Sequence, residues 1–246
     1  VTAVRELLHS IKGFKQLHIF ESTTNKGLAK SVIEGVSHVL QLYDRVIVLE
    51  DDMLCAKDFL SYSNEALEVY EHRKDIFTIS GYGPAIDIPE EYKDDVYLVA
   101  RASSWGWSTW RDRWNKADWD VSDFLQMKKD KDLQAQLNQG GEDLWPMLVK
   151  QQKGIINSWA VRWTWTQTKN QAWGLYPIHS KIRNIGTDGS GENFSTSTTV
   201  YDSQLSTRKV HFNPTIQPDY RIASNFAALY KLSFFRKLVN WWKYTI

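Results

Sequence analysis

Over the first fifty positions, the spacing of apolar residues predicts a helix, a strand, a second helix and a second strand, in that order. Residues 1–14 and 28–43 carry apolar side chains every three or four positions, as amphipathic helices do. Leu17–Phe20 and Arg45–Leu49 are short apolar runs, which predict strands. Two strands joined by a helix at this spacing form a βαβ unit, which favours a parallel sheet.

The remaining pattern extends this α/β fold class, and we expect a mostly parallel sheet flanked by helices. Further predicted strands cover residues 76–79 and 96–100, and predicted helices cover residues 59–70, 128–139 and 159–168, with another that carries Trp110 and Trp114. Residues 186–208 are rich in Gly, Ser and Thr and predict a mobile loop. Sheets of this class usually begin with a strand, so we expect the first strand upstream of Val1.

Three consecutive carboxylates follow the predicted strand Arg45–Leu49. Glu50, Asp51 and Asp52 are costly at the end of a buried strand unless their charge is compensated, and a divalent cation with oxygen ligands is the usual compensation. In open α/β sheets, ligands lie at the carboxyl ends of the strands. The alternative is a helix N-terminus, where the exposed N–H groups stabilise acids.

Composition narrows the function classes. A net charge of +1 gives no field that attracts nucleic acid. The single cysteine, Cys55, allows no intrachain disulfide, and no apolar run is long enough to span a bilayer, so we expect a cytoplasmic protein. The chain has 12 tryptophans, and this residue is common in sugar-binding sites, although most of them should lie in the core.

The C-terminal stretch combines aromatic and basic residues. We expect the tail, residues 213–246, to form a helix over Asn225–Ile246, which contains no acid. Such a helix suits the surface of an anionic membrane, which would place the protein at the periphery of the inner membrane. A helix packed on the catalytic part is the other interpretation, and both stay open.

The order of several motifs resembles a known family. Asn25–Ala29, then Val46–Asp52, then Asp58–Leu60 resemble glycosyltransferases of the A-type fold, above all N-acetylglucosaminyltransferase I and its bacterial sugar-transferase relatives. The segments Trp105–Trp107 and Asn184–Gly186 support the resemblance by their order and spacing. It covers residues 17–194, of which the acid triplet is the specific part.

The resemblance implies a catalytic domain over residues 1–212, with a donor half of about 1–100 and an acceptor half of about 101–212. It implies transfer of a sugar from a nucleotide-sugar, uridine-linked by expectation, to a hydroxyl of a saccharide or glycolipid acceptor. The transfer would invert the anomeric centre and serve surface polysaccharide or lipopolysaccharide synthesis. Carried over onto this sequence, Asp52 binds Mn²⁺ or Mg²⁺. Glu50 and Asp51 face the nucleotide-sugar, with Asn25 and Gly27 as further contacts, while Arg183 would pair with phosphate or lie at the surface.

The catalytic base follows from the same resemblance. The family places an Asp two residues before a Trp, and Asp143 before Trp145 matches that pattern, with Glu142 as the reserve. A competing alignment puts Ala160 at this position and offers no acid. Glu142 and Asp143 could also simply begin a helix, in which case Asp188 is the next candidate.

Two other function classes remain open from the sequence. A sugar nucleotidyltransferase also holds a metal and a phosphate with acids at a strand end, but it would carry a Gly-rich first loop with Lys or Arg. A non-catalytic carbohydrate-binding module would explain the tryptophans but not the acid triplet.

Overall fold

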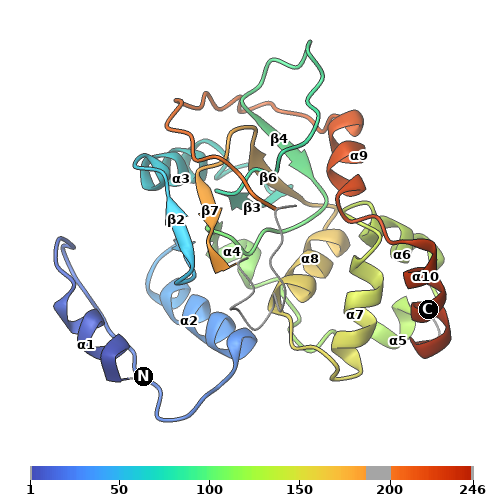
Figure 1. The fold of residues 1–246 in the computed structure, drawn as a ribbon, viewed down its shortest axis with the longest axis horizontal. Helices are drawn as coiled ribbons and strands as arrows, with labels where there is room; N and C mark the ends of the chain where they lie inside the picture. The colour runs from blue at the N-terminus through green and yellow to red at the C-terminus, as the bar shows by residue number, and fades with distance from the viewer. Residues whose placement is uncertain (1, 187–200, 245–246) are drawn as a thin grey trace.

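The computed structural model describes residues 2–186 and 201–244, and its centre is a five-stranded sheet (Figure 1). The strand order is β1-β5-β3-β6-β4. The strands are β1 (Arg45–Val48), β3 (Ile76–Ser80), β4 (Val96–Val99), β5 (Trp107–Trp110) and β6 (Trp173–Pro177). A second sheet pairs β2 (Met53–Cys55) with β7 (Ile182–Asn184).

The predicted mostly parallel sheet is wrong. Only β3 and β6 pair in parallel, whereas β1–β5, β3–β5 and β4–β6 are antiparallel. One cause is β5, which we did not predict: Trp110 was expected on a helix together with Trp114, but it ends strand β5, which inserts between β1 and β3. Strands β1 and β3 therefore point the same way but are separated by a strand that runs against both.

Most of the helices pack around this sheet or beside it, and α1 lies apart. They are α1 (Thr2–Ser10), α2 (Leu28–Leu42), α3 (Phe59–Val69), α4 (Arg111–Trp114), α5 (Phe124–Met127), α6 (Lys131–Asn138), α7 (Leu144–Gln152), α8 (Trp159–Lys169), α9 (Tyr220–Ala228) and α10 (Phe234–Tyr244). None of the described helices is long and apolar enough to cross a membrane.

Two predicted elements differ from the structure. Leu17–Phe20 has no strand partner among the described residues, and α1 before it buries no side chain. Figure 1 shows α1 apart from the main body. The predicted tail helix is two helices, α9 and α10, because the chain leaves the helical conformation between Leu229 and Ser233.

Two apolar clusters sandwich the sheet. Helix α3 packs against one side through Tyr62, Leu67 and Tyr70, and the same cluster contains Trp110. Helices α2 and α8 cover the other side, where Trp107 stacks on Trp159 with ring centroids 4.8 Å apart. Most of the tryptophans are therefore core residues, as expected.

Candidate functional site

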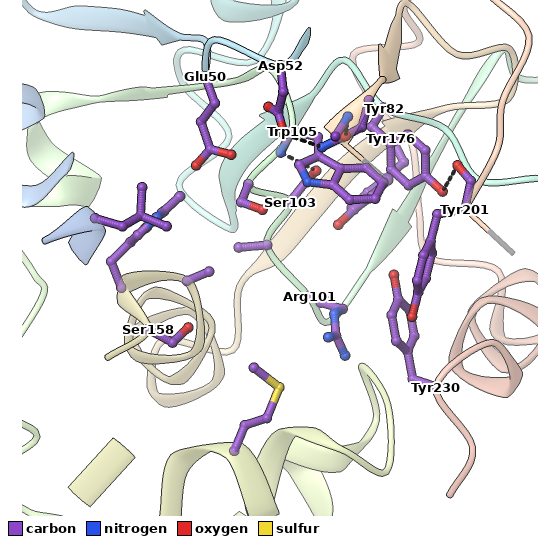
Figure 2. A pocket seen from close by; sticks show the side chains of 18 of the residues that line it. Glu50, Asp52, Tyr82, Arg101, Ser103, Trp105, Ser158, Tyr176, Tyr201 and Tyr230 are labelled. Carbon is purple, nitrogen blue, oxygen red and sulfur yellow. Dashed lines mark hydrogen bonds between the residues drawn. The ribbon is translucent and has the colours of Figure 1, made fainter. Parts of the chain in front are cut away.

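A cleft of about 740 Å³ opens where the sheet, α8 and the C-terminal segment meet. Its size suits a small-molecule ligand. Figure 2 shows Glu50 and Asp52 on one side, Ser158 at the start of α8, and Tyr230 at the far end. The walls come from the turn after β1, the segment after β4, the start of α8, strand β7 and the segment after α9, and they include Asp51, Arg101, Ala102, Ser103, Ser104, Trp105, Asn157, Trp159 and Asn184.

The acid triplet lies in this cleft and is electrostatically crowded. Burial, followed by the neighbouring charges of Asp52 and Asp51, raises the pKa of Glu50 to about 7. The Oδ1 atom of Asp52 is buried and has no hydrogen-bond partner among the described residues. Buried carboxylate oxygens rarely remain unsatisfied, so Asp52 Oδ1 is available as one ligand of a cation. Among the described residues, no three Asp, Glu, His or Cys side chains converge on a common metal position, so the remaining ligands would have to come from a bound substrate or water.

The second sheet brings a distant segment to Asp52. In the β2–β7 pair, Asn184 stands opposite Met53, and its side-chain amide donates to Asp52 Oδ2 at 3.3 Å. Its carbonyl oxygen accepts from the Gly186 N–H at 2.6 Å. A Cβ atom at Gly186 would lie 2.3 Å from Asp52 Oδ2, so only glycine allows this approach.

The predicted phosphate partner Arg183 lies on the other side of strand β7. Its side chain is exposed, whereas Ile182 and Asn184 on either side are buried, and it does not line the cleft. The sequence had singled out Asn184 only as part of the segment Asn184–Gly186 and did not predict its contact with Asp52. Strand alternation around Arg183 could have placed its two neighbours on one shared face.

The turn that carries Asn25 and Gly27 lies beside the cleft without lining it. Asn25 Oδ1 accepts from the Gly27 N–H at 2.8 Å, and Gly27, with a φ of 73°, immediately precedes α2. The next residue, Leu28, lines the cleft, as does Asn157 before α8. Helices α2 and α8 thus both begin at the cleft, and their partial positive charge favours an anion there. Asn157 and Ser158 carried no recognised motif and were missed.

The predicted base Asp143 lies directly behind the cleft wall. Both of its oxygens accept hydrogen bonds from Arg101, at 2.8 and 2.9 Å. Arg101 lines the cleft, donates to the Gly140 carbonyl at 3.2 Å and lies 3.7 Å from the ring centroid of Tyr230. The structure thus makes Asp143 the partner of a cleft arginine.

The reserve acid Glu142 contacts the C-terminal segment. Its Oε2 accepts from the Leu232 N–H at 2.9 Å and from Lys237 Nζ at 2.8 Å, and these bonds lower its pKa. Glu142 does not line the cleft. The next candidate, Asp188, lies outside the described residues.

Aromatic rings line the side of the cleft that leads from the triplet to Tyr230. Trp105 meets Tyr82 edge-on at 4.8 Å and Tyr201 edge-on at 5.7 Å, and Tyr201 stacks on Tyr230 at 6.4 Å. Figure 2 shows Trp105 between the acids and the tyrosines. Flat rings with polar tips can hold a polyhydroxylated ring. The cleft therefore combines an end suited to a metal-bound anion with an end suited to a sugar.

Comparison with known proteins gives a partial match to a glycosyltransferase. No family model matches the chain. Over 97 residues it is 33% identical to the alpha-1,3-mannosyl-glycoprotein 2-beta-N-acetylglucosaminyltransferase of Arabidopsis thaliana, a match that covers 35% of this chain and 21% of that protein. The chain thus spans about a fifth of that relative's length. Over about a third of its length, the similarity supports a relationship between this chain and a glycosyltransferase.

Proposed function

We propose that this protein is a metal-dependent glycosyltransferase that moves a sugar from a nucleotide-sugar, uridine-linked by expectation, to a hydroxyl of a saccharide or glycolipid. The proposal rests on the buried Oδ1 of Asp52, which has no hydrogen-bond partner in the part of the chain that the structure describes and lies in a cleft with an aromatic wall. The proposed setting is synthesis of a bacterial surface polysaccharide or lipopolysaccharide.

The donor lies at the acidic end in this proposal. Asp52 would hold Mn²⁺ or Mg²⁺, which bind proteins through one or two carboxylates together with substrate phosphates. When bound, such a cation supplies positive charge that stabilises the departing diphosphate. Glu50 and Asp51 would face the nucleotide-sugar. The starts of α2 and α8 add favourable potential for the diphosphate.

The acceptor lies against the aromatic wall of Trp105, Tyr82 and Tyr201. Its hydroxyl oxygen attacks the anomeric carbon while the bond from that carbon to the diphosphate oxygen breaks, and the diphosphate leaves with the bonding electrons. The hydroxyl proton passes to a base. Asp143 stays the proposed base by resemblance, and it can act only if Arg101 releases at least one of its two hydrogen bonds.

A thermal-shift experiment tests the donor site. Mn²⁺ with uridine diphosphate at about 100 times the dissociation constant should stabilise the folded protein by about 2.7 kcal/mol. For a chain of this size, that corresponds to a rise in melting temperature of roughly 5–11 °C. Asp52→Ala should abolish the rise. Asp44→Asn is the matched control, because Asp44 is 85% exposed and lies at the opposite end of β1.

The outcomes separate the alternatives. An unchanged shift in Asp52→Ala would remove Asp52 as the ligand. Release of uridine diphosphate from a nucleotide-sugar, dependent on an acceptor sugar, supports the transferase. Release of pyrophosphate from a nucleoside triphosphate and a sugar phosphate would instead identify a nucleotidyltransferase, and sugar binding without metal or turnover would identify a carbohydrate-binding module.

A further inference from the structure

Helix α10 presents its apolar side to solvent. Phe234, Leu238 and Trp241 recur at spacings of four and three residues, and Phe235 and Trp242 adjoin them, so the five side chains share one face of the helix. Their exposed fractions are 78%, 46%, 66%, 75% and 77% in the order named. A surface helix normally buries this face, and α10 does the reverse.

The polar side of α10 attaches it to the protein. Lys237 forms an ion pair with Glu142 at 2.8 Å, and Asn240 is 4% exposed. The Leu232 N–H, just before the helix, donates to the same carboxylate. The orientation is therefore held by specific contacts, and the aromatic face is directed outward (Figure 1 shows α10 at the edge of the molecule).

Basic residues accompany the aromatic face. Lys231, Arg236 and Lys243 are exposed, and Tyr220–Ile246 contains no Asp or Glu. Burial, and after it the nearby charge of Arg236, lower the pKa of Lys150 in α7. Basic side chains beside exposed aromatic rings are the combination that binds a surface with negative charge outside and an apolar interior.

We propose that α10 docks this protein on the surface of an anionic lipid bilayer, with its five apolar side chains in the headgroup region. Indole and phenyl rings suit the boundary between headgroups and acyl chains, and the basic side chains reach the lipid phosphates. The same connection carries Tyr230, two residues before Leu232, which contacts Arg101 in the cleft. The bilayer would thus lie on the side of the molecule where the aromatic end of the cleft is anchored.

Vesicle flotation of the whole chain tests the proposal. The probes are vesicles of equal parts phosphatidylcholine and phosphatidylglycerol, and vesicles of phosphatidylcholine alone. The wild type should float with the anionic vesicles and be released by high salt. Trp241→Ser with Trp242→Ser should reduce the partition coefficient about tenfold or more, since two apolar side chains no longer enter the interface. Arg236→Gln with Lys243→Gln should reduce it roughly fivefold per charge.

A control pair distinguishes this face from exposed apolar residues in general. Phe20→Ser with Leu125→Ser changes two side chains outside α10 that are 73% and 75% exposed, and its flotation should equal that of the wild type. Circular dichroism establishes that each variant is folded. This readout is independent of metal and donor, so its failure and the failure of the proposed function are distinguishable.

Three results would overturn the inference. The first is an absence of flotation for the folded wild type. The second is an equal loss in the control pair. The third is dimerisation of the wild type, measured by light scattering and abolished by the double tryptophan variant, because the face would then bind a second copy of the chain.

Discussion

The pair formed by Arg101 and Asp143 offers the sharpest test of how the cleft wall is built. Their side chains are only 13% and 21% exposed, and two parallel hydrogen bonds join them. Burial alone lowers the pKa of Arg101, but the bonds to Asp143 outweigh it and raise the pKa overall, so the guanidinium stays charged. Removing the acid would leave that charge with the Gly140 carbonyl and the ring of Tyr230.

We expect Asp143→Ala to lower the free energy of unfolding by about 3 kcal/mol. Breaking a buried ion pair by removing one partner costs about 3–5 kcal/mol, and the partial exposure of this pair places it at the lower end. For 246 residues this corresponds to a fall in melting temperature of roughly 6–12 °C. Arg101→Met should cost a similar amount. The double variant should lose clearly less than the sum, because neither charge is then left unpaired.

Urea unfolding followed by circular dichroism, with the two single variants and the double variant, measures this coupling. The surface pair of Asp44 and Arg111, 3.1 Å apart with side chains 85% and 39% exposed, is the matched control, and Asp44→Ala should cost at most about 1 kcal/mol. Additive effects at Arg101 and Asp143, or a loss below about 1 kcal/mol in Asp143→Ala, would refute this description of the pair.

Turnover of the same variants separates a base from a positioning residue. If Asp143 takes the proton, Asp143→Asn should reduce turnover on the order of 10²–10⁴-fold and leave donor binding nearly unchanged. Glu142→Gln should have much less effect. If Asp143 acts by holding Arg101, Arg101→Met should reduce turnover as much as Asp143→Asn does.

Two further predictions concern single contacts. Gly186→Ala places a methyl group 2.3 Å from Asp52 Oδ2, so this variant should lose the melting-temperature rise from Mn²⁺ and uridine diphosphate. Gly35→Ala is the control and should keep the rise, because a Cβ atom at Gly35 meets no atom within 4 Å. A normal rise in Gly186→Ala would contradict the described approach. Asp219 begins α9 by accepting from the Arg221 N–H at 2.9 Å, and its hydrogen bond to the Arg221 side chain is the main cause that lowers its pKa from 3.8 to about 2. The ionised carboxylate of Asp219 therefore stabilises the fold above about pH 4, and this contribution is lost as the pH falls toward 2. Asp219→Ala should lower the free energy of unfolding by about 1 kcal/mol at neutral pH, and this difference from the wild type should shrink between about pH 4 and pH 2 in acid-unfolding measurements.

Local patterns were sufficient to predict the strongly periodic elements. The helices now seen as α2, α3 and α8 and the strands β1, β3 and β4 agree with the predictions to within one or two residues. The position of the acid triplet at the end of β1 was also readable from the sequence, because it depends only on which residues follow an apolar run. These features are local, since a helix or strand repeats its own period along the chain.

The strand order and the neighbours of the site were decided by the tertiary structure. Strand β5 lies between β1 and β3 and places Trp110 in the cluster of α3 and Trp107 in the cluster of α2 and α8, and no periodicity along the chain encodes that position. The isolated run Leu17–Phe20 has strand character but no strand to pair with among the described residues. A strand requires a partner for its backbone hydrogen bonds, so its own sequence is not sufficient.

The same reason explains the site. Asp52 could be predicted as a site residue from its own segment. Its partner Asn184 is 132 positions away in the sequence, and Arg101, the partner of Asp143, is 42 positions away. Residue types and local spacing determined which acids this protein places at a strand end. Packing of distant segments alone decided which of those acids lie in the cleft, which are paired behind its wall, and that the aromatic face of α10 remains in solvent.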